Sequence, residues 1–264
     1  MKKRTLPALK LQKSPLVLVL CQVRFSPILA MADYFPKVQD SLRLKGYPSV
    51  KTDIVQETLF TPAGLTSMKK SRWRVFNKDL TESIVVTEDF IVFQTTKYTV
   101  FENFVQKLAE VMETLASVVK QLAIQRIGLR YIDLIRPRAN ETWRNYVRPE
   151  LHGLSNAVLK PDTQLQLQQT VANTERGTLI TRLYQNREGQ IFPPDLTDDS
   201  LTANLTPLPD QGELLTLIDL DHFCTVQCDY EPAQLEDIVW QLHDDIDRVF
   251  RESVVTPSAL KAWE

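Results

Sequence analysis

The chain has 264 residues, of which 43% are hydrophobic and 24% charged, and these values exclude disorder over most of its length. Its formal net charge of −2 argues against a dedicated nucleic-acid coat protein, because such proteins are strongly basic. No stretch approaches the roughly 20 apolar residues that a membrane span needs. The odd number of cysteines, three, argues against a disulfide framework. We therefore predict a cytoplasmic protein that does not act at a membrane.

The first half of the chain predicts a basic tail followed by an α+β unit. Residues 1–13 contain five basic side chains and no acidic one, and we interpret them as a solvated tail. Residues 16–25 begin as an apolar run and end with Cys21, Val23 and Phe25 alternating with polar residues, which predicts a strand. A helix should follow, broken at Pro36 and ending at Gly46. The remaining elements expected in this half are strands at 50–60, 71–77, 83–87 and 90–95 and a long helix at 100–122.

The second half predicts a similar order of elements. A strand at 126–135 is followed by a short helix that Asn140 caps and that ends near Leu151. Residues 193–212 contain four prolines and predict a loop. Pro232 begins a second long helix. The other strands are expected at 164–173, at 178–186 and at 214–228, the last being one long strand or a tight hairpin near Asp221.

These two patterns predict an α+β fold made of two similar halves, residues 14–123 and 124–264. Each half would run strand, helix, several strands and long helix, giving an antiparallel sheet with long helices on one face. Such a duplication resembles the saddle of TATA-binding proteins or a pair of helix-grip units. Arg24 and Arg130 occupy matching places in the opening strands of the two halves. Both should point away from the apolar side, toward one polar sheet face.

Arginine is the residue type that most clearly suggests a binding surface. Residues 126–148 contain six arginines, and Arg144 and Arg148 lie one predicted helical turn apart beside Trp143 and Tyr146. Guanidinium groups suit phosphates and carboxylates, but they can equally pair with the 33 acidic residues of the chain. The candidate partner-binding residues are Arg24, Arg72, Arg74, Arg126, Arg130, Arg144 and Arg148.

The patterns of common enzyme sites are missing, so we assign no catalytic residue, cofactor or metal. The seven glycines are scattered, which excludes a G-x-G-x-x-G motif and a P-loop. His222, Cys224 and Cys228 share a strand face, but the outer two stand about 20 Å apart on a regular strand, and core packing is the preferred interpretation. Asp219 and Asp221 also share a face, and we interpret them as a solvent-facing pair at a strand end.

Several short segments resemble a sporadically distributed family of uncharacterised bacterial proteins. They are Ser14-Pro15-Leu16 with Arg24-Phe25-Ser26-Pro27, the central Gly128-Leu129-Arg130-Tyr131, and Leu242-His243, Phe250, Thr256 and Trp263 near the end. The chain departs from that family at Asp133 and Arg251, where the family often has Asn and Glu. The resemblance implies no activity. Its sporadic distribution implies an accessory gene, such as one of an antiviral defence system, that works with its neighbours.

The sequence thus favours a non-enzymatic interaction or adaptor module that binds a protein partner through a polar sheet face. The partner would be encoded nearby, or would be a second copy attracted by the acidic last helix. The alternative is a nucleic-acid binder that uses the arginine-rich segment 126–148. A weaker alternative is a hydrolase or nuclease that uses Asp219 and Asp221 with His222.

Overall fold

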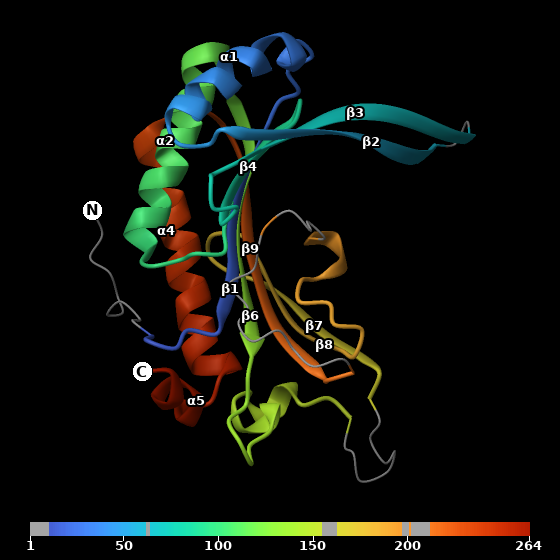
Figure 1. Ribbon diagram of the computed structural model, residues 1–264, viewed down its shortest axis with the longest axis vertical. Coiled ribbons are helices and arrows are strands. Elements are labelled where there is room, and N and C mark those ends of the chain that lie inside the picture. The colour runs from blue at the N-terminus through green and yellow to red at the C-terminus, as the bar shows by residue number, and fades with distance from the viewer. Residues whose placement is uncertain (1–10, 62–63, 155–162, 197–200, 202–211) are drawn as a thin grey trace.

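A computed structural model describes residues 11–61, 64–154, 163–196, 201 and 212–264 (Figure 1). Its centre is one nine-stranded sheet in the order β2-β3-β4-β5-β1-β6-β9-β8-β7, with every neighbouring pair antiparallel. The strands are β1 (Leu16–Phe25), β2 (Ser49–Thr61), β3 (Gly64–Phe76), β4 (Glu82–Val86), β5 (Phe90–Thr95), β6 (Ala123–Ile135), β7 (Leu165–Asn173), β8 (Thr178–Asn186) and β9 (Leu215–Asp229).

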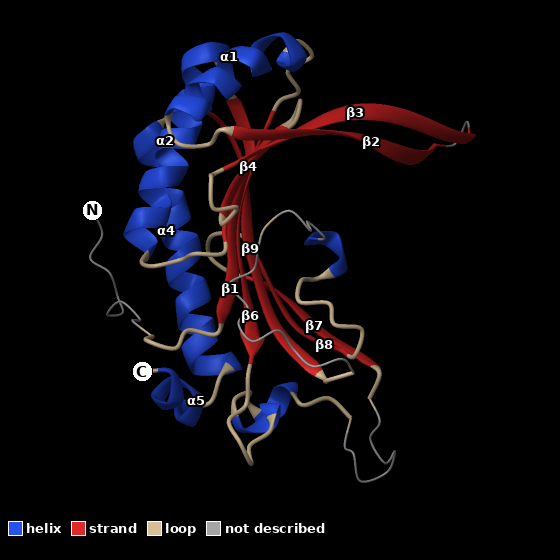
Figure 2. Ribbon diagram, viewed as in Figure 1, coloured by secondary structure: helices blue, strands red, loops and turns tan. Residues whose placement is uncertain are grey.

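Three long helices cover one face of this sheet, as Figure 2 shows. They are α1 (Met31–Leu44), α2 (Phe101–Val119) and α4 (Pro232–Val249); a π-helical turn (Phe250–Val254) and the short α5 (Pro257–Trp263) follow the last. Side chains alternate along a strand, so in β1 from Val19 on and in β6 from Ile127 on the odd-numbered residues enter the core beneath the helices, as Cys21 and Leu129 do. The even-numbered residues face the opposite side, which we call the open face.

The open face is partly covered by the segment between β8 and β9. Ile191, Phe192, Leu196 and Leu201 of this segment pack on a second apolar cluster that includes Leu20 and other residues of the sheet. The 3-10 turn η3 (Pro194–Leu196) lies in this covering segment. In Figure 1 the β2–β3 hairpin projects away from the helices, and β7 and β8 curve toward the same side, so two hairpins flank the open face.

The predicted α+β class and the antiparallel sheet are confirmed, and the two predicted halves share that one sheet through the pairing of β1 with β6. The two-fold duplication and the TATA-binding-protein-like form remain predictions. No described helix is long and apolar enough to cross a membrane. The cysteines Cys21, Cys224 and Cys228 are all free.

Two local predictions were wrong, and of the two forms expected at 214–228 the single long strand is the one observed. Helix α1 runs unbroken through Pro36, which lies one turn from its start and on its exposed side, where one backbone hydrogen bond is lost without a clash in the core. The helix expected from Asn140 is replaced by two 3-10 turns, η1 (Trp143–Asn145) and η2 (Pro149–Leu151), because Pro149 interrupts helical bonding. Strand β9 continues through Asp221 without a hairpin, because it pairs with β6 and β8 along most of its length.

The turn between β7 and β8 has no room for a side chain at Gly177. A Cβ atom there would lie 2.0 Å from the carbonyl oxygen of Phe223 in the adjacent β9. We predict that Gly177→Ala lowers the free energy of unfolding by about 1–3 kcal/mol through this overpacking.

Urea denaturation with Gly189→Ala as the control tests this prediction. Gly189 has a positive φ of 75° but open space around it, so alanine there costs only the backbone strain of about 1–2 kcal/mol. A smaller loss at Gly177 than at Gly189 would contradict the packing argument.

Candidate functional site

The open face contains a cavity of about 330 Å³ over the centre of the sheet. We call it the arginine hollow. Four of the seven arginines predicted as partner-binding line it, and they come from β3 and β6. Its lining residues are Leu20, Gln22, Arg72, Arg74, Val85, Phe90, Val92, Gln94, Arg126, Gly128, Arg130, Asp195, Leu196 and Asp221.

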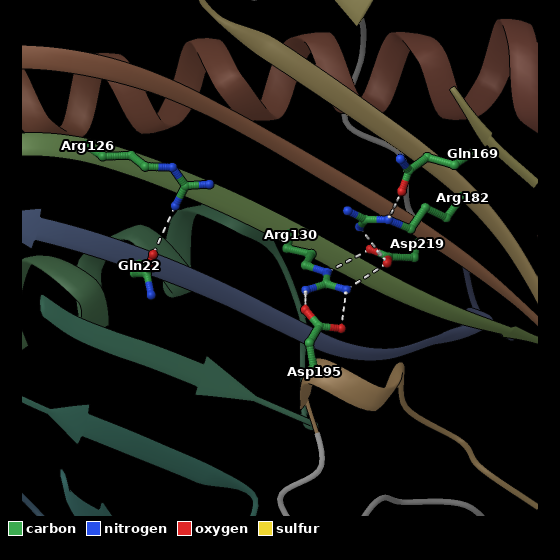
Figure 3. Close-up of polar contacts among 7 residues, drawn as sticks. All are labelled: Gln22, Arg126, Arg130, Gln169, Arg182, Asp195 and Asp219. Atoms are coloured by element: carbon green, nitrogen blue, oxygen red, sulfur yellow. Dashed lines mark hydrogen bonds and ion pairs between the residues drawn. The ribbon is translucent and has the colours of Figure 1, made fainter. Parts of the chain in front are cut away.

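Arg130 is the most constrained side chain of the arginine hollow, and only 6% of the residue is exposed. Its Nε and Nη2 each donate a hydrogen bond of 2.7 Å to Asp219, and its Nη1 and Nη2 donate to Asp195 at 2.5 and 3.2 Å (Figure 3). Burial opposes the charge, but the bonds to the two carboxylates raise the pKa of Arg130 above its ordinary value. The guanidinium is therefore a permanent cation held between a carboxylate of the sheet and a carboxylate of the covering segment.

Asp219 is fully buried, which corrects the expectation of a solvent-facing aspartate pair. Besides Arg130 it accepts a 2.9 Å bond from Nη1 of Arg182 on β8, and Nε of Arg182 donates to Gln169 on β7 at 2.7 Å. A buried carboxylate needs such partners because its desolvation costs several kcal/mol. This chain of contacts ties β6, β9, β8 and β7 together on the open face (Figure 3).

Asp221 lies on the same face but differs from Asp219 in its surroundings. Burial raises its pKa, against the opposing effect of Arg130 and Arg126. His222 points to the helix side, where its Nδ1 lies 3.2 Å from the carbonyl oxygen of Leu242 and its Nε2 lies 2.9 Å from the hydroxyl of Thr174. The structure therefore does not bring His222 together with Asp219 and Asp221, and the Asp219 carboxylate is fully buried and engaged by Arg130 and Arg182.

Arg126 is the arginine of the hollow with the fewest acidic contacts. Its Nη1 donates to the amide oxygen of Gln22 at 2.9 Å, and its guanidinium lies 4.1 Å from the centre of the Phe223 ring. Burial lowers its pKa, and the nearby Asp221 opposes that effect. A guanidinium stacked on an aromatic ring keeps its donor edge directed outward, which suits a planar anion.

The other two arginines of the hollow share one carboxylate. Nη2 of Arg74 lies 2.7 Å and Nη2 of Arg72 lies 3.3 Å from Asp53 on β2. The Nε of Arg72 is buried and makes no hydrogen bond within the described part of the chain. This side of the hollow thus keeps an unused donor beside its ion pairs.

Three predicted arginines lie outside the arginine hollow. Arg24 shares the open face but forms a 2.7 Å ion pair with Asp89. Arg144 stacks on Trp143, 4.5 Å from the ring centre, and Arg148 precedes η2 and donates its backbone N–H to Val254. The structure therefore separates Arg144 and Arg148, near the C-terminal segments, from the arginines at the sheet centre.

Sequence reasoning missed Arg182, Gln22 and Asp195 as members of this site. Alternation along β8 places Arg182 on the open face, a signal that was present in the sequence. Asp195 had no such signal, because its position depends on how the proline-rich segment folds back over the sheet.

No group of three or more potential metal ligands is found among the described residues. No protein-family model matches the chain, and no curated protein matches it significantly.

We predict that Arg130→Met destabilises the protein by about 3 kcal/mol, because Asp219 then keeps its burial but loses its best partner. The measurement is chemical denaturation at pH 7. The double variant Arg130→Met/Asp219→Asn should recover most of the loss, since it removes the unpaired charge. Equal stability of the single and double variants would show that the pair does not organise this face.

Proposed function

We propose that the protein is a non-enzymatic cytoplasmic interaction module that binds an acidic segment of a protein partner through its open face. The resemblance noted in the sequence supports a partner encoded nearby in an accessory system. The arginine hollow would receive carboxylates of the partner, and the flanking hairpins would contact the rest of the segment. Ionised carboxylates and guanidinium groups form hydrogen bonds about twice as strong as neutral ones.

One observation carries this proposal: the arginine hollow already holds a carboxylate from a segment that lies across the sheet. Asp195 is largely exposed, yet both of its oxygens contact Arg130. Burial opposes ionisation, but the hydrogen bond from Arg130 lowers the pKa of Asp195. The contact supports recognition of an aspartate or glutamate presented by a partner in the same manner.

Strand β7 adds an apolar contact surface to the same face. It is an edge strand of the sheet, and Leu165, Leu167 and Val171 on it are exposed. They pair with even-numbered residues of β8, so they point to the same side as Arg182. Exposed hydrophobic residues on an edge strand mark a site where another chain can pair or pack.

The order of the strands supports the proposed relation between the two halves. In each half the opening strand lies at the sheet centre, the last strand lies beside it, and a hairpin lies at the edge. Arg24 pairs with Arg126, and Leu20 pairs with Arg130, so Gln22 and Gly128 lie at the midpoint. We propose that this pseudo-symmetric centre is where the partner binds.

A nucleic-acid partner is less well supported. Within the described residues, Asp53, Asp195 and Asp219 already contact three of the four arginines that line the hollow. A nucleic-acid backbone presents a row of phosphates and needs several guanidinium groups that the protein does not itself neutralise, whereas one carboxylate of a protein segment needs a single such group, as Arg126 provides.

Affinity purification of the full chain from its native host, with nuclease treatment, tests the proposal. We predict a co-purifying protein whose recovery falls about tenfold with Arg126→Gln, because one charge-assisted contact is lost. Arg248→Gln, on the exposed side of α4, is the matched control and should leave recovery unchanged.

Two outcomes would contradict the proposal. One is capture of nucleic acid that disappears with nuclease. The other is capture of a protein that depends on neither substitution, since it would place the interface elsewhere.

A further inference from the structure

A second cavity lies on the helix side of the sheet, separate from the arginine hollow. Its volume is about 440 Å³, within the range of small-molecule sites. It opens between the start of α2, the end of α4 and the strands β1 and β6. Its walls are mostly apolar and aromatic, with Leu16, Phe101, Ile246 and Phe250 among them.

Asp133 on β6 is the unusual residue of this cavity. It is 4% exposed, and no hydrogen bond or ion pair to its carboxyl group is found in the part of the chain that the structure describes. Burial raises its pKa to about 8. A buried carboxyl group without a partner costs stability, so its presence at a cavity wall indicates a role other than packing.

An ordered polar group stands beside Asp133. The hydroxyl of Tyr131 lies 2.9 Å from Nδ1 of His243, and the His243 ring stacks on Phe101 with ring centres 3.7 Å apart. The Tyr98 ring meets Tyr131 edge-on at 6.1 Å. These contacts fix the aromatic walls before any ligand enters, which reduces the entropy cost of binding.

The charge of the cavity lining has one sign. Glu102, Asp133 and Asp247 are the acidic residues of its lining, and no lysine or arginine is found among the lining residues that the structure describes. Asp247 is already engaged by Arg251 at 2.6 and 2.7 Å, and Glu102 is exposed at the rim. Asp133 is therefore the buried acid left to meet a positive group.

We propose that this cavity binds a small primary amine with an apolar body, whose ammonium group pairs with Asp133 while its body packs against the aromatic walls. A cation would meet both the carboxylate and the ring faces, which attract positive charge. A metal ion fits less well, because no group of three or more suitable ligands is found among the described residues. The proposal does not depend on the arginine hollow.

Release of a proton on binding distinguishes pairing of an ammonium group with Asp133 from apolar packing of the ligand alone. The titratable groups that line the cavity with Asp133 are Tyr131 on its own strand, Tyr98 before α2, Glu102 on α2, and His243 and Asp247 on α4. At pH 7 the carboxyl group is largely protonated in the free protein, and pairing with an ammonium group requires the carboxylate. Binding should therefore release close to one proton per amine, and affinity should rise between pH 6 and pH 8.

Isothermal titration calorimetry of the full chain with phenethylamine tests the proposal, with 2-phenylethanol and phenylacetate as probes of the same shape but different charge. We expect one phenethylamine per chain, bound at least tenfold more tightly than 2-phenylethanol. Repeating the titration in buffers of different ionisation enthalpy measures the released proton. Asp133→Asn should abolish both the preference and the proton release, whereas Asp79→Asn, in an exposed turn, should retain both.

Equal affinity for phenethylamine and 2-phenylethanol would overturn the proposal, as would absence of phenethylamine binding. Retention of the amine preference by Asp133→Asn would overturn it as well. The buffer comparison on the unmodified protein needs no variant, so a folding defect in Asp133→Asn leaves the test intact. Arg126→Gln should bind phenethylamine as the unmodified protein does, which separates this site from the arginine hollow.

Discussion

The buried carboxylate of Asp219 is the constraint on which the open face depends. Because it is fully withdrawn from water, it must be held by cations, and Arg130 and Arg182 supply them from the two neighbouring strands. Arg130 then has donors left for Asp195, so the same interaction positions the covering segment. One buried charge thus fixes the relative placement of β6, β8, β9 and η3.

The two faces of the sheet meet different physical demands. The helix face is closed by α1, α2 and α4 over a continuous apolar core, and the cavity beside Asp133 opens on this side. The open face has a smaller apolar cluster and an arginine-rich centre. A binding surface built on sheet strands is held more rigidly than one built on loops, which suits recognition of a partner without rearrangement.

Much of this architecture was predictable from local patterns. Alternation gave β1 with its observed bounds, and the apolar stripe of α2 gave a long helix on the core side. Local patterns failed where tertiary contacts decide the outcome. Pro36 is tolerated in α1. The burial of Asp219 could not be foreseen from local sequence, because its partners Arg130 and Arg182 lie 89 and 37 residues away in the chain.

In the candidate sites, too, local sequence patterns predict which face a residue occupies but not which residues it contacts. The alternation of side chains along a strand predicts Arg24, Arg126 and Arg130 on one face, as observed. It does not reveal which of these arginines form ion pairs with acidic residues of the same chain. The cavity beside Asp133 was missed, although an aspartate inside the apolar run Tyr131-Ile132-Asp133-Leu134 was a visible signal. A carboxyl group buried in an apolar strand costs stability whether it is ionised or neutral, so its presence there indicates a role other than packing.

If the arginine hollow recognises carboxylates of an acidic segment, a hexaglutamate peptide should bind there. NMR of the arginine Nε–Hε groups during titration of the full chain with this peptide should show saturable shifts of the Arg126 and Arg130 signals, with Arg144 and Arg148 unaffected. Shifts confined to Arg144 and Arg148, or shifts that added salt reproduces without peptide, would contradict this recognition.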